Sequence, residues 1–285
     1  MVKDNTKNTL LKKVKVSIIV LTINSKEMLS NMLSNISKLY TSGLNAKCIV
    51  VDNGSTDGTA DFARKFKLPN MNYEFIETGK NLGFAGGNNV GIRKSLKNND
   101  EYVVVVNDDV VLEKDFLIKM VGFMIDNPKV GIASPKIYFT KKDKEVIWYA
   151  GGNIDWDNIY TSHRGVDEVD KGQFDKTIQT DSASGACMII NNQVFGETGL
   201  LDEGFYLYWE DADLSQRVKR NGYEVVYYPK VKVWHKVSAS AGGIGSKSND
   251  YFLIRNRLFF TMRYAKTRTK LAVLKDTFKL VFVGR

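Results

Sequence analysis

Apolar positions follow two different periods along the first 130 residues. Short apolar runs rich in β-branched residues predict buried strands, and apolar residues at spacings of three or four predict helices between them. The predicted strands are 15–22, 46–51, 72–76 and 101–106, and the predicted helices are 25–40, 56–67, 86–96 and 114–126. Strands that alternate with helices in this way predict an α/β fold, with a mostly parallel, doubly wound sheet and helices on both faces.

The second half of the chain is less regular. Its predicted strands are 131–138, 181–190 and 224–228, and its predicted helix is 211–221. Residues 141–180 show little pattern. Residues 238–250 are rich in Gly and Ser, which predicts a loop. We expect this loop to close as a lid over a bound substrate, with an inert surface loop as the alternative.

Two polar clusters come directly after predicted strands. Residues 52–55 (DNGS) follow the second strand and residues 107–109 (NDD) follow the fourth. Because ligands of a parallel sheet bind outside the carboxyl ends of its strands, both clusters should face one crevice. Asp52 can accept a hydrogen bond there from a base N–H or a ribose hydroxyl, although a capped βα turn also explains it. The crevice is therefore a candidate nucleotide site.

Adjacent carboxylates at a strand end are costly unless a cation or a donor compensates them. Asp108 and Asp109 offer oxygen ligands of the kind that Mg²⁺ or Mn²⁺ uses when it bridges to a diphosphate. A helix N-cap is the alternative, but the apolar residues 110–112 delay the next helix. His235, after the apolar segment 231–235, is either structural or an imidazole ligand that joins Asp109 on the metal.

Two further segments carry candidate chemistry. Residues 81–89 are rich in glycine before a helix, but they match neither the dinucleotide-binding fingerprint nor a P-loop, which disfavours a dehydrogenase or an NTPase. Residues 209–213 (WEDAD) place acidic side chains in a first helical turn, where they suit the helix dipole. One of them can instead be a general base, because the sequence holds only two histidines.

Composition narrows the class of protein. With 43% apolar and 26% charged residues, the chain is globular, which excludes a disordered chain, a coiled coil and a collagen-like fibre. The two cysteines, Cys48 and Cys187, are too few for a disulfide framework and are predicted to be reduced and buried, as in an intracellular protein. Two histidines without a CxxC motif exclude a zinc finger. The sequence predicts neither a signal peptide in the first 14 residues nor a membrane span.

Charge is distributed unevenly. Residues 214–285 carry a net charge of +13 and the first 213 residues carry −4. A basic end predicts an anionic partner, with a solvated tail as the alternative. Within 251–285, aromatic residues are interleaved with nine basic residues and one acidic residue. This pattern predicts a basic amphipathic helix that meets an anionic membrane, unless the aromatics pack on the body of the protein.

Together these segments resemble the family 2 glycosyltransferases of the GT-A fold, in particular the rhamnosyltransferase-like branch that builds bacterial and archaeal surface polysaccharides. The segments are VSIIVLTIN (16–24), VDNGSTDGT (51–59), NLGFAGGNNVGI (81–92), VNDDVVL (106–112), SGACMII (184–190) and FYLYWEDADLSQRVKRNGYEV (205–225). The resemblance covers about residues 14–236. It implies a GT-A domain at 1–245, with a nucleotide-binding half at 14–112 and an acceptor and catalytic half at 113–245, followed by a C-terminal helical extension at 246–285.

The resemblance also implies a role for each matching residue. The nucleotide-sugar donor would be bound by Thr22, Asn24, Asp52, Asn81, Gly86 and Asp108. Asp52 would accept the pyrimidine N3–H. Asp109 and His235 would hold Mn²⁺ or Mg²⁺. Asp211 would be the catalytic base, with Trp209 and Glu210 at the acceptor. Asn107 stands where many members of the family carry Asp, so this site has one carboxylate fewer.

The activity implied by the resemblance is an inverting, metal-dependent transfer of a sugar such as rhamnose. The donor would be a UDP- or dTDP-sugar, and the acceptor a hydroxyl of a surface polysaccharide or a lipid-linked oligosaccharide, at the inner face of the membrane in the cytoplasm. The alternatives are a nucleotidyltransferase, a binding-only relative and a nucleic-acid-binding module. Residues 16–26 lack the basic, glycine-rich loop of a nucleotidyltransferase, and the acidic crevice disfavours nucleic acid as a partner.

Overall fold

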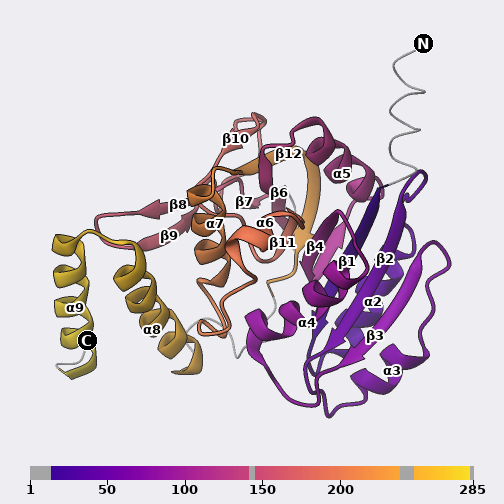
Figure 1. The fold of residues 1–285 in the computed structure, drawn as a ribbon, viewed down its shortest axis with the longest axis horizontal. Helices are drawn as coiled ribbons and strands as arrows, with labels where there is room; N and C mark the ends of the chain where they lie inside the picture. Colours follow the sequence, from indigo (N-terminus) through magenta and orange to yellow (C-terminus); the bar gives the residue numbers. More distant parts are fainter. Residues whose placement is uncertain (1–13, 141–144, 238–246, 283–285) are drawn as a thin grey trace.

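The computed structural model of the protein describes residues 14–140, 145–237 and 247–282. Its N-terminal half is a parallel α/β unit. The elements are β1 (Lys15–Thr22), α2 (Lys26–Ile36), β2 (Asn45–Asp52), α3 (Thr59–Lys65), β3 (Asn72–Glu77), α4 (Gly83–Lys97) and β4 (Tyr102–Asn107). The strands lie in the order β3-β2-β1-β4, and every neighbouring pair is parallel (Figure 1). The four predicted strands and the alternating topology of this half are confirmed.

The C-terminal half extends the same sheet. Its elements are β5 (Val110–Leu112), α5 (Phe116–Asp126), β6 (Val130–Phe139), β7 (Ile147–Tyr149), β8 (Gly152–Asp155), β9 (Tyr160–His163), β10 (Ile178–Gln179), β11 (Cys187–Asn191), α6 (Val194–Thr198), α7 (Glu210–Arg220), β12 (Glu224–His235), α8 (Lys247–Tyr264) and α9 (Thr267–Phe282). The strand order continues from β4 as β11-β6-β12-β10. Strand β11 is antiparallel to both of its neighbours, whereas β12 is parallel to β6. The result is a mixed α/β fold around a mostly parallel central sheet.

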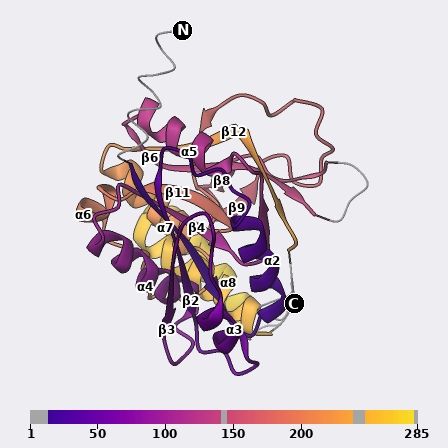
Figure 2. The ribbon, with the colours of Figure 1, turned by 90° about the vertical axis from the view of Figure 1, so that its right-hand side faces the viewer.

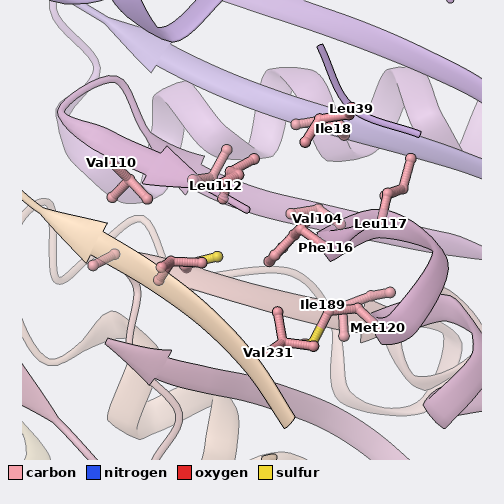
Figure 3. Close-up of a cluster of buried hydrophobic side chains, with 14 of the residues drawn as sticks. Ile18, Leu39, Val104, Val110, Leu112, Phe116, Leu117, Met120, Ile189 and Val231 are labelled. Carbon is pink, nitrogen blue, oxygen red and sulfur yellow. The ribbon is translucent and has the colours of Figure 1, made fainter. Parts of the chain in front are cut away.

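The central strands β1, β2, β4 and β11 are buried on both faces because most of their residues are apolar. On β1, Ile18 belongs to the core on one face and Ile19 to the core on the other. Helices α2, α3 and α5 pack on the first face, and helices α4, α6 and α7 pack on the second (Figures 1 and 2). Figure 3 shows the first core, where Phe116 and Met120 of α5 lie against Val104 of β4 and Ile189 of β11. Cys48 and Cys187 are free thiols within this core.

Several predicted boundaries were wrong for local reasons. The helix expected at 56–67 begins only at Thr59, because Gly58 adopts a φ of 85° and the Asp57 side chain accepts a hydrogen bond from the Thr59 amide. The helix expected at 86–96 begins earlier, at Gly83. The strand expected at 181–190 begins only at Cys187.

Other differences lie in the second half. The segment 141–180, which shows little pattern in the sequence, contains the strands β7 to β10. Of the expected loop 238–250, residues 247–250 are the first turn of α8. The rest of that loop, with the predicted lid, lies outside the described residues, as does the predicted domain boundary between 245 and 246.

Helices α8 and α9 lie side by side at the end of the molecule opposite β3 (Figure 1). Phe260 of α8 and Val273 of α9 are buried in a third core, together with Phe205 and Trp209. The extension therefore packs on the body of the protein. No helix in the described part of the chain is long and apolar enough to cross a membrane.

Two of the basic residues in 251–285 contact the body of the protein. Arg257 is only 7% exposed, and its guanidinium donates to the carbonyls of Asn158 and Ile159 at 2.6 and 3.0 Å. Arg263 pairs with Asp202 and Asp213 at 2.7 and 2.6 Å. These two arginines hold the extension to the body, because a buried or half-buried guanidinium needs partners of its own.

Candidate active site

The carboxyl ends of three parallel strands meet at one edge of the sheet. Thr22 at the end of β1 lies opposite Asp52 at the end of β2, and Leu21 lies opposite Asn107 at the end of β4. The Thr22 hydroxyl donates to Asp108 Oδ2 at 2.7 Å. Both polar clusters predicted from the sequence therefore border the same edge, as the parallel topology requires.

Asp52 is buried, with 2% of its surface exposed, and only one of its oxygens is satisfied. Its Oδ2 accepts from the amides of Gly54 and Ser55 at 3.2 and 3.0 Å. Its Oδ1 is buried and has no hydrogen-bond partner among the described residues. Because a buried acceptor without a donor is costly, this oxygen is suited to accept an N–H from a bound nucleobase.

Asn24 and Asn81 both stabilise turns at this edge. Asn24, which is exposed and has a φ of 47°, accepts from the Thr56 amide at 2.7 Å and so joins the loop after β1 to the loop after β2. Asn81 Oδ1 accepts from the Gly83 amide at 2.9 Å and from Asn53 Nδ2 at 3.0 Å. Both residues border the site through loops that their own side chains organise.

Gly86 lies in the first turns of α4, where a Cβ would come within 2.9 Å of the Leu82 Cβ. Packing within the helix is therefore a sufficient reason for glycine there. Asn53 had no separate role in the predicted 52–55 cluster, but it is 2% exposed and donates to Gly83 O at 3.1 Å. It also accepts from the Leu82 amide at 3.0 Å. Asn53 thus fixes the start of α4 to the end of β2, and its place beside Asp52 was the available signal.

Asp109 and His235 come together although 126 positions separate them in the sequence. Strand β5 pairs antiparallel with the end of β12, so that Val110 lies opposite His235. His235 Nε2 lies 3.1 Å from Asp109 Oδ1, and the two residues are 7% and 8% exposed. Burial raises the pKa of the neighbouring Asp108 to about 6, a shift that the Thr22 hydrogen bond opposes and the Asp109 charge increases. The pair predicted as metal ligands is thus in contact.

Asp109 and His235 suit a divalent cation whose coordination shell is completed by phosphate oxygens of the substrate. Within the described ranges, no group of three or more His, Cys, Asp and Glu side chains could hold a metal by itself. Mg²⁺ is commonly held by one or two carboxylates plus phosphate oxygens of the substrate, and Asp109 offers one such carboxylate with the His235 imidazole beside it. His235 Nδ1 is buried without a hydrogen-bond partner in the described part of the chain, and its ring packs edge-on against Trp148 at 4.5 Å. A ring held by packing keeps its nitrogen directed at Asp109.

Asp211 lies in the first turn of α7 and remains half-buried. Its Oδ2 accepts from the Gly185 amide at 2.9 Å and its Oδ1 from the Ala212 amide at 2.7 Å. The next residue after Gly185, Ala186, accepts from the Asn107 amide at 3.1 Å, which brings Asp211 next to the Asn107–Asp109 cluster. Burial raises the pKa of Asp211, and its amide partners oppose the rise. A partly accessible carboxylate with a raised pKa has the properties of a general base.

Glu210 and Trp209, predicted to contact the acceptor, are more buried than Asp211. Glu210 is 4% exposed, and burial together with the Asp211 charge raises its pKa well above the ordinary value. Trp209 is 7% exposed, and its ring lies 5.0 Å from that of Phe260 on α8. Packing accounts for the position of Trp209, and its contact with an acceptor stays a prediction.

Asp213, expected from the sequence to suit the dipole of α7 like the other acidic residues of 209–213, lies at the centre of an ionic cluster. Asp213 is fully buried and accepts from Arg217 Nε at 2.8 Å, Arg263 Nη1 at 2.6 Å and the Tyr264 hydroxyl at 2.7 Å. Two of these three partners come from α8. Arg263 and Tyr264 lie about 50 positions after Asp213 in the sequence, so no local pattern could predict these contacts.

The chain is similar to known glycosyltransferases in sequence. The family model for glycosyl transferase family 2 matches residues 17–199. The low-salt glycan biosynthesis hexosyltransferase Agl10 from Haloferax volcanii is 28% identical over 242 residues, which cover 85% of this chain and 73% of that protein. The dTDP-rhamnosyl transferase RfbF from Shigella flexneri is 27% identical over 257 residues, which cover 87% of this chain and 82% of that protein.

The fold also matches solved structures. The mannosyltransferase PcManGT from Pyrobaculum calidifontis, solved with GDP-Man and Mn²⁺, aligns with a TM-score of 0.61 at 17% identity, over 95% of this chain and 72% of that one. At this identity the match concerns the fold, which is that of the GT-A glycosyltransferases. A GT-A sheet whose strand ends carry the matched motifs, together with the family model over residues 17–199, shows that this chain belongs to glycosyl transferase family 2 and is a glycosyltransferase.

Proposed function

We propose that the chain transfers a sugar from a pyrimidine nucleotide diphospho-sugar to a hydroxyl of a glycan or a lipid-linked oligosaccharide, with inversion at the anomeric carbon and with a divalent metal. The observation that carries this proposal is the meeting of Asp52, the Asp109 and His235 pair and Asp211 around the ends of neighbouring strands. RfbF, named for dTDP-rhamnose, and Agl10, named for glycan biosynthesis, support rhamnose or another hexose as the sugar and a glycan as the acceptor.

The nucleotide is bound at the ends of β1 and β2. Asp52 Oδ1, the buried oxygen without a partner in the described residues, accepts the N3–H of uracil or thymine. Thr22 orients Asp108 toward the ribose by the 2.7 Å hydrogen bond between them. Asn24, Asn81 and Gly86 line the donor pocket. Guanine also offers an N–H to a carboxylate, and PcManGT was solved with GDP-Man, so the preference for a pyrimidine is a point for experiment.

Asp109 and His235 would hold Mn²⁺ or Mg²⁺ beside the donor diphosphate. When bound, the ion neutralises the negative charge of the leaving diphosphate, which is a Lewis-acid contribution of several kcal/mol in comparable sites. A metal ion binds a ring nitrogen that carries no proton, so His235 Nε2, which lies 3.1 Å from Asp109 Oδ1, would have to be unprotonated to act as a ligand. The residue therefore binds the metal best in its neutral form.

Asp211 accepts the proton of the acceptor hydroxyl. The hydroxyl oxygen then bonds to the anomeric carbon from the face opposite the diphosphate, while the bond from that carbon to the diphosphate oxygen breaks and the nucleoside diphosphate leaves. A single displacement of this kind inverts the anomeric configuration. Trp209 and Glu210 lie on the acceptor side, beside the base, where their burial limits the movement of the start of α7.

A donor screen tests the reaction. UDP-, dTDP- and GDP-sugars are titrated into the full chain with and without Mn²⁺, and donors that bind are then tested for metal-dependent hydrolysis and transfer. We expect metal-dependent binding of one pyrimidine donor and, by NMR of the product, an inverted anomeric linkage. A product with retained configuration would contradict the single displacement. Synthesis of a nucleotide sugar from a nucleoside triphosphate and a sugar phosphate would instead favour the nucleotidyltransferase.

The exposed apolar side chains of α8 and α9 support a second part of the proposal, contact with an anionic membrane. Exposed large apolar residues on these helices are Tyr251, Leu253, Phe259, Met262, Leu271, Leu274 and Phe278. On α9, Leu271, Leu274 and Phe278 share one face and are accompanied by exposed lysines, the pattern of an interfacial helix. The enzyme then works as a peripheral protein at the cytoplasmic face, near a lipid-linked acceptor.

Liposome flotation tests this contact. The intact chain should float with vesicles that contain anionic lipid and remain behind with neutral vesicles. The triple substitution Leu271→Ser, Leu274→Ser and Phe278→Ser should abolish flotation and leave donor binding unchanged. Failure of the intact chain to float would remove the membrane from the proposal and leave the transfer reaction untouched.

A further inference from the structure

The segment that leads into the candidate base has an unusual backbone. Tyr206, Tyr208 and Trp209 adopt φ angles of 64°, 68° and 73°, although none of them is glycine. Residues with a Cβ avoid this region, so they persist there only where surrounding contacts determine the conformation. Asp211 follows two residues later. The position of the base therefore depends on whatever holds residues 205–209.

One buried side chain of α8 provides most of these contacts. Asn256 is fully buried, and its Nδ2 lies 2.8, 2.7 and 2.8 Å from the carbonyl oxygens of Phe205, Leu207 and Tyr208. A side-chain amide has two N–H groups, so three carbonyls saturate its capacity to donate. No other residue type of this size offers two donors on one planar nitrogen, which explains asparagine at this position.

Within residues 205–208, the carbonyl that Asn256 does not contact is that of Tyr206, and the start of α4 holds it. Tyr206 O accepts from the amides of Phe84 and Ala85, at the start of α4, at 2.7 and 3.2 Å. Gly83 permits this approach, because a Cβ there would lie 2.5 Å from the Tyr206 carbonyl oxygen. The carbonyls of four consecutive residues, 205–208, are thus all fixed, three of them by Asn256.

Helix α8 also holds the chain on both sides of Asp211. Before it, the Phe260 ring packs on Trp209 at 5.0 Å. After it, Arg263 and Tyr264 donate to Asp213 at 2.6 and 2.7 Å. These contacts hold the start of α7 on both sides of Asp211, and the Gly185 and Ala212 amides then orient the carboxylate itself.

We infer that Asn256 is a positioning residue for the catalytic base, and that α8 belongs to the catalytic machinery in addition to any contact with a membrane. The inference rests on the proposed role of Asp211. Misplacement of a reacting group by about 1 Å can cost a reaction roughly 100-fold. Loss of the Asn256 amide should therefore slow the transfer step itself and leave donor binding, at the ends of β1 and β2, intact.

The test compares Asn256→Ala with Thr261→Val in the full chain. Thr261 is equally buried on the same helix, but its hydroxyl donates at 2.6 Å to Arg257 O within α8, so its loss reports on the helix alone. We expect Asn256→Ala to lower kcat by roughly 10- to 100-fold with the donor KM within about twofold of the wild-type value. Thr261→Val should keep both constants close to wild type.

Hydrogen exchange gives a readout that is independent of activity. Asn256→Ala should speed amide exchange across residues 205–211 and leave the strands unchanged, whether or not the right sugar donor is known. If the wild-type chain transfers sugar from none of the tested donors but the variant shows this exchange pattern, the proposed reaction is contradicted. The role of Asn256 in holding residues 205–209 then still stands. A loss of kcat that Thr261→Val reproduces, or a loss confined to KM, would overturn the inference.

A milder variant covers the case in which Asn256→Ala does not fold. Tyr264→Phe keeps the ring and removes only the hydroxyl that donates to Asp213. It should fold, lower kcat several-fold and leave the donor KM unchanged. Wild-type kcat in a folded Tyr264→Phe chain, together with wild-type exchange at 209–213, would show that the contact of α8 with Asp213 does not position the base.

Discussion

The proposed donor side and the proposed acceptor side of the site are built by different means. On the donor side, Thr22, Asp52 and Asp108 stand at the ends of three neighbouring parallel strands, and the sheet register alone brings them together. On the acceptor side, Asp211 is brought to the same edge by a left-handed segment held by Asn256, from a helix about 50 positions later in the sequence. Paired β-strands are held by many hydrogen bonds and tolerate the loss of a single side-chain contact. A segment that depends on one side chain does not tolerate the loss of that side chain. The two sides should therefore respond differently to substitution.

The largest effect is expected at the acceptor side, for Asp211→Asn. The amide keeps the shape of the side chain but cannot accept the proton of the acceptor hydroxyl, so transfer should fall by roughly 10²- to 10⁴-fold. Donor binding, measured by calorimetry, should remain. Asp126→Asn, an exposed carboxylate at the end of α5, is the control and should retain full activity. A near wild-type rate for Asp211→Asn would mean that another group is the base.

The metal pair should give the next effect. His235→Ala removes the nitrogen that lies 3.1 Å from Asp109 Oδ1, so calorimetric affinity for Mn²⁺ in the presence of nucleotide should fall by at least about tenfold. His163→Asn is the matched control, because His163 packs on the same Trp148 ring at 4.4 Å. Burial lowers the pKa of His163 to about 4, so it is neutral near pH 7. Equal losses of affinity in the two variants would point to packing around Trp148 as the cause.

Gly87→Ala tests the packing of the donor side. A Cβ at Gly87 would lie 2.4 Å from Leu21 Cδ1, between α4 and β1, so we expect a loss of about 1–3 kcal/mol in the free energy of unfolding. Gly122→Ala in α5 is the control, since a Cβ there meets nothing within 4 Å, and it should gain about 0.5–1 kcal/mol. Urea unfolding of both variants measures the difference. A gain in both would show that α4 does not pack tightly on β1.

The smallest effect, in stability, concerns Glu210. Burial raises its pKa in the folded chain above the ordinary value of 4.5, so the folded state binds the proton more tightly than the unfolded state does. Stability from this carboxyl is therefore present in acid and is lost as the pH rises from about 4.5 toward the raised pKa, by about 1.4 kcal/mol for each pKa unit.

Glu210→Gln removes that pH dependence. It should leave the melting temperature nearly unchanged at pH 4 and raise it, relative to wild type, at pH 7 and above. If the melting temperatures of Glu210→Gln and of the wild type changed in parallel with pH over this range, the carboxyl would ionise freely in the folded chain.

The core residues and candidate site residues of the N-terminal half follow from local pattern. The β-branched runs of β1, β2 and β4 encode buried strands by themselves, and each polar cluster begins where its run ends. Even there, the start of α3 was mispredicted, because the φ of Gly58 and the Asp57 side chain determine it. The conformation of a turn depends on single side-chain hydrogen bonds, and the spacing of apolar residues carries no information about them.

What the sequence by itself determined was the parallel α/β half, the strand-end clusters and the identity of the acidic and imidazole candidates, because these signals span only a few neighbouring positions. Only the tertiary structure decided that β7 to β10 exist, that Asp213 is buried among side chains of α8 and that Asn256 holds the approach to Asp211. Those features rest on short strands and on single polar contacts between residues about 50 positions apart, and such contacts leave no period in the chain.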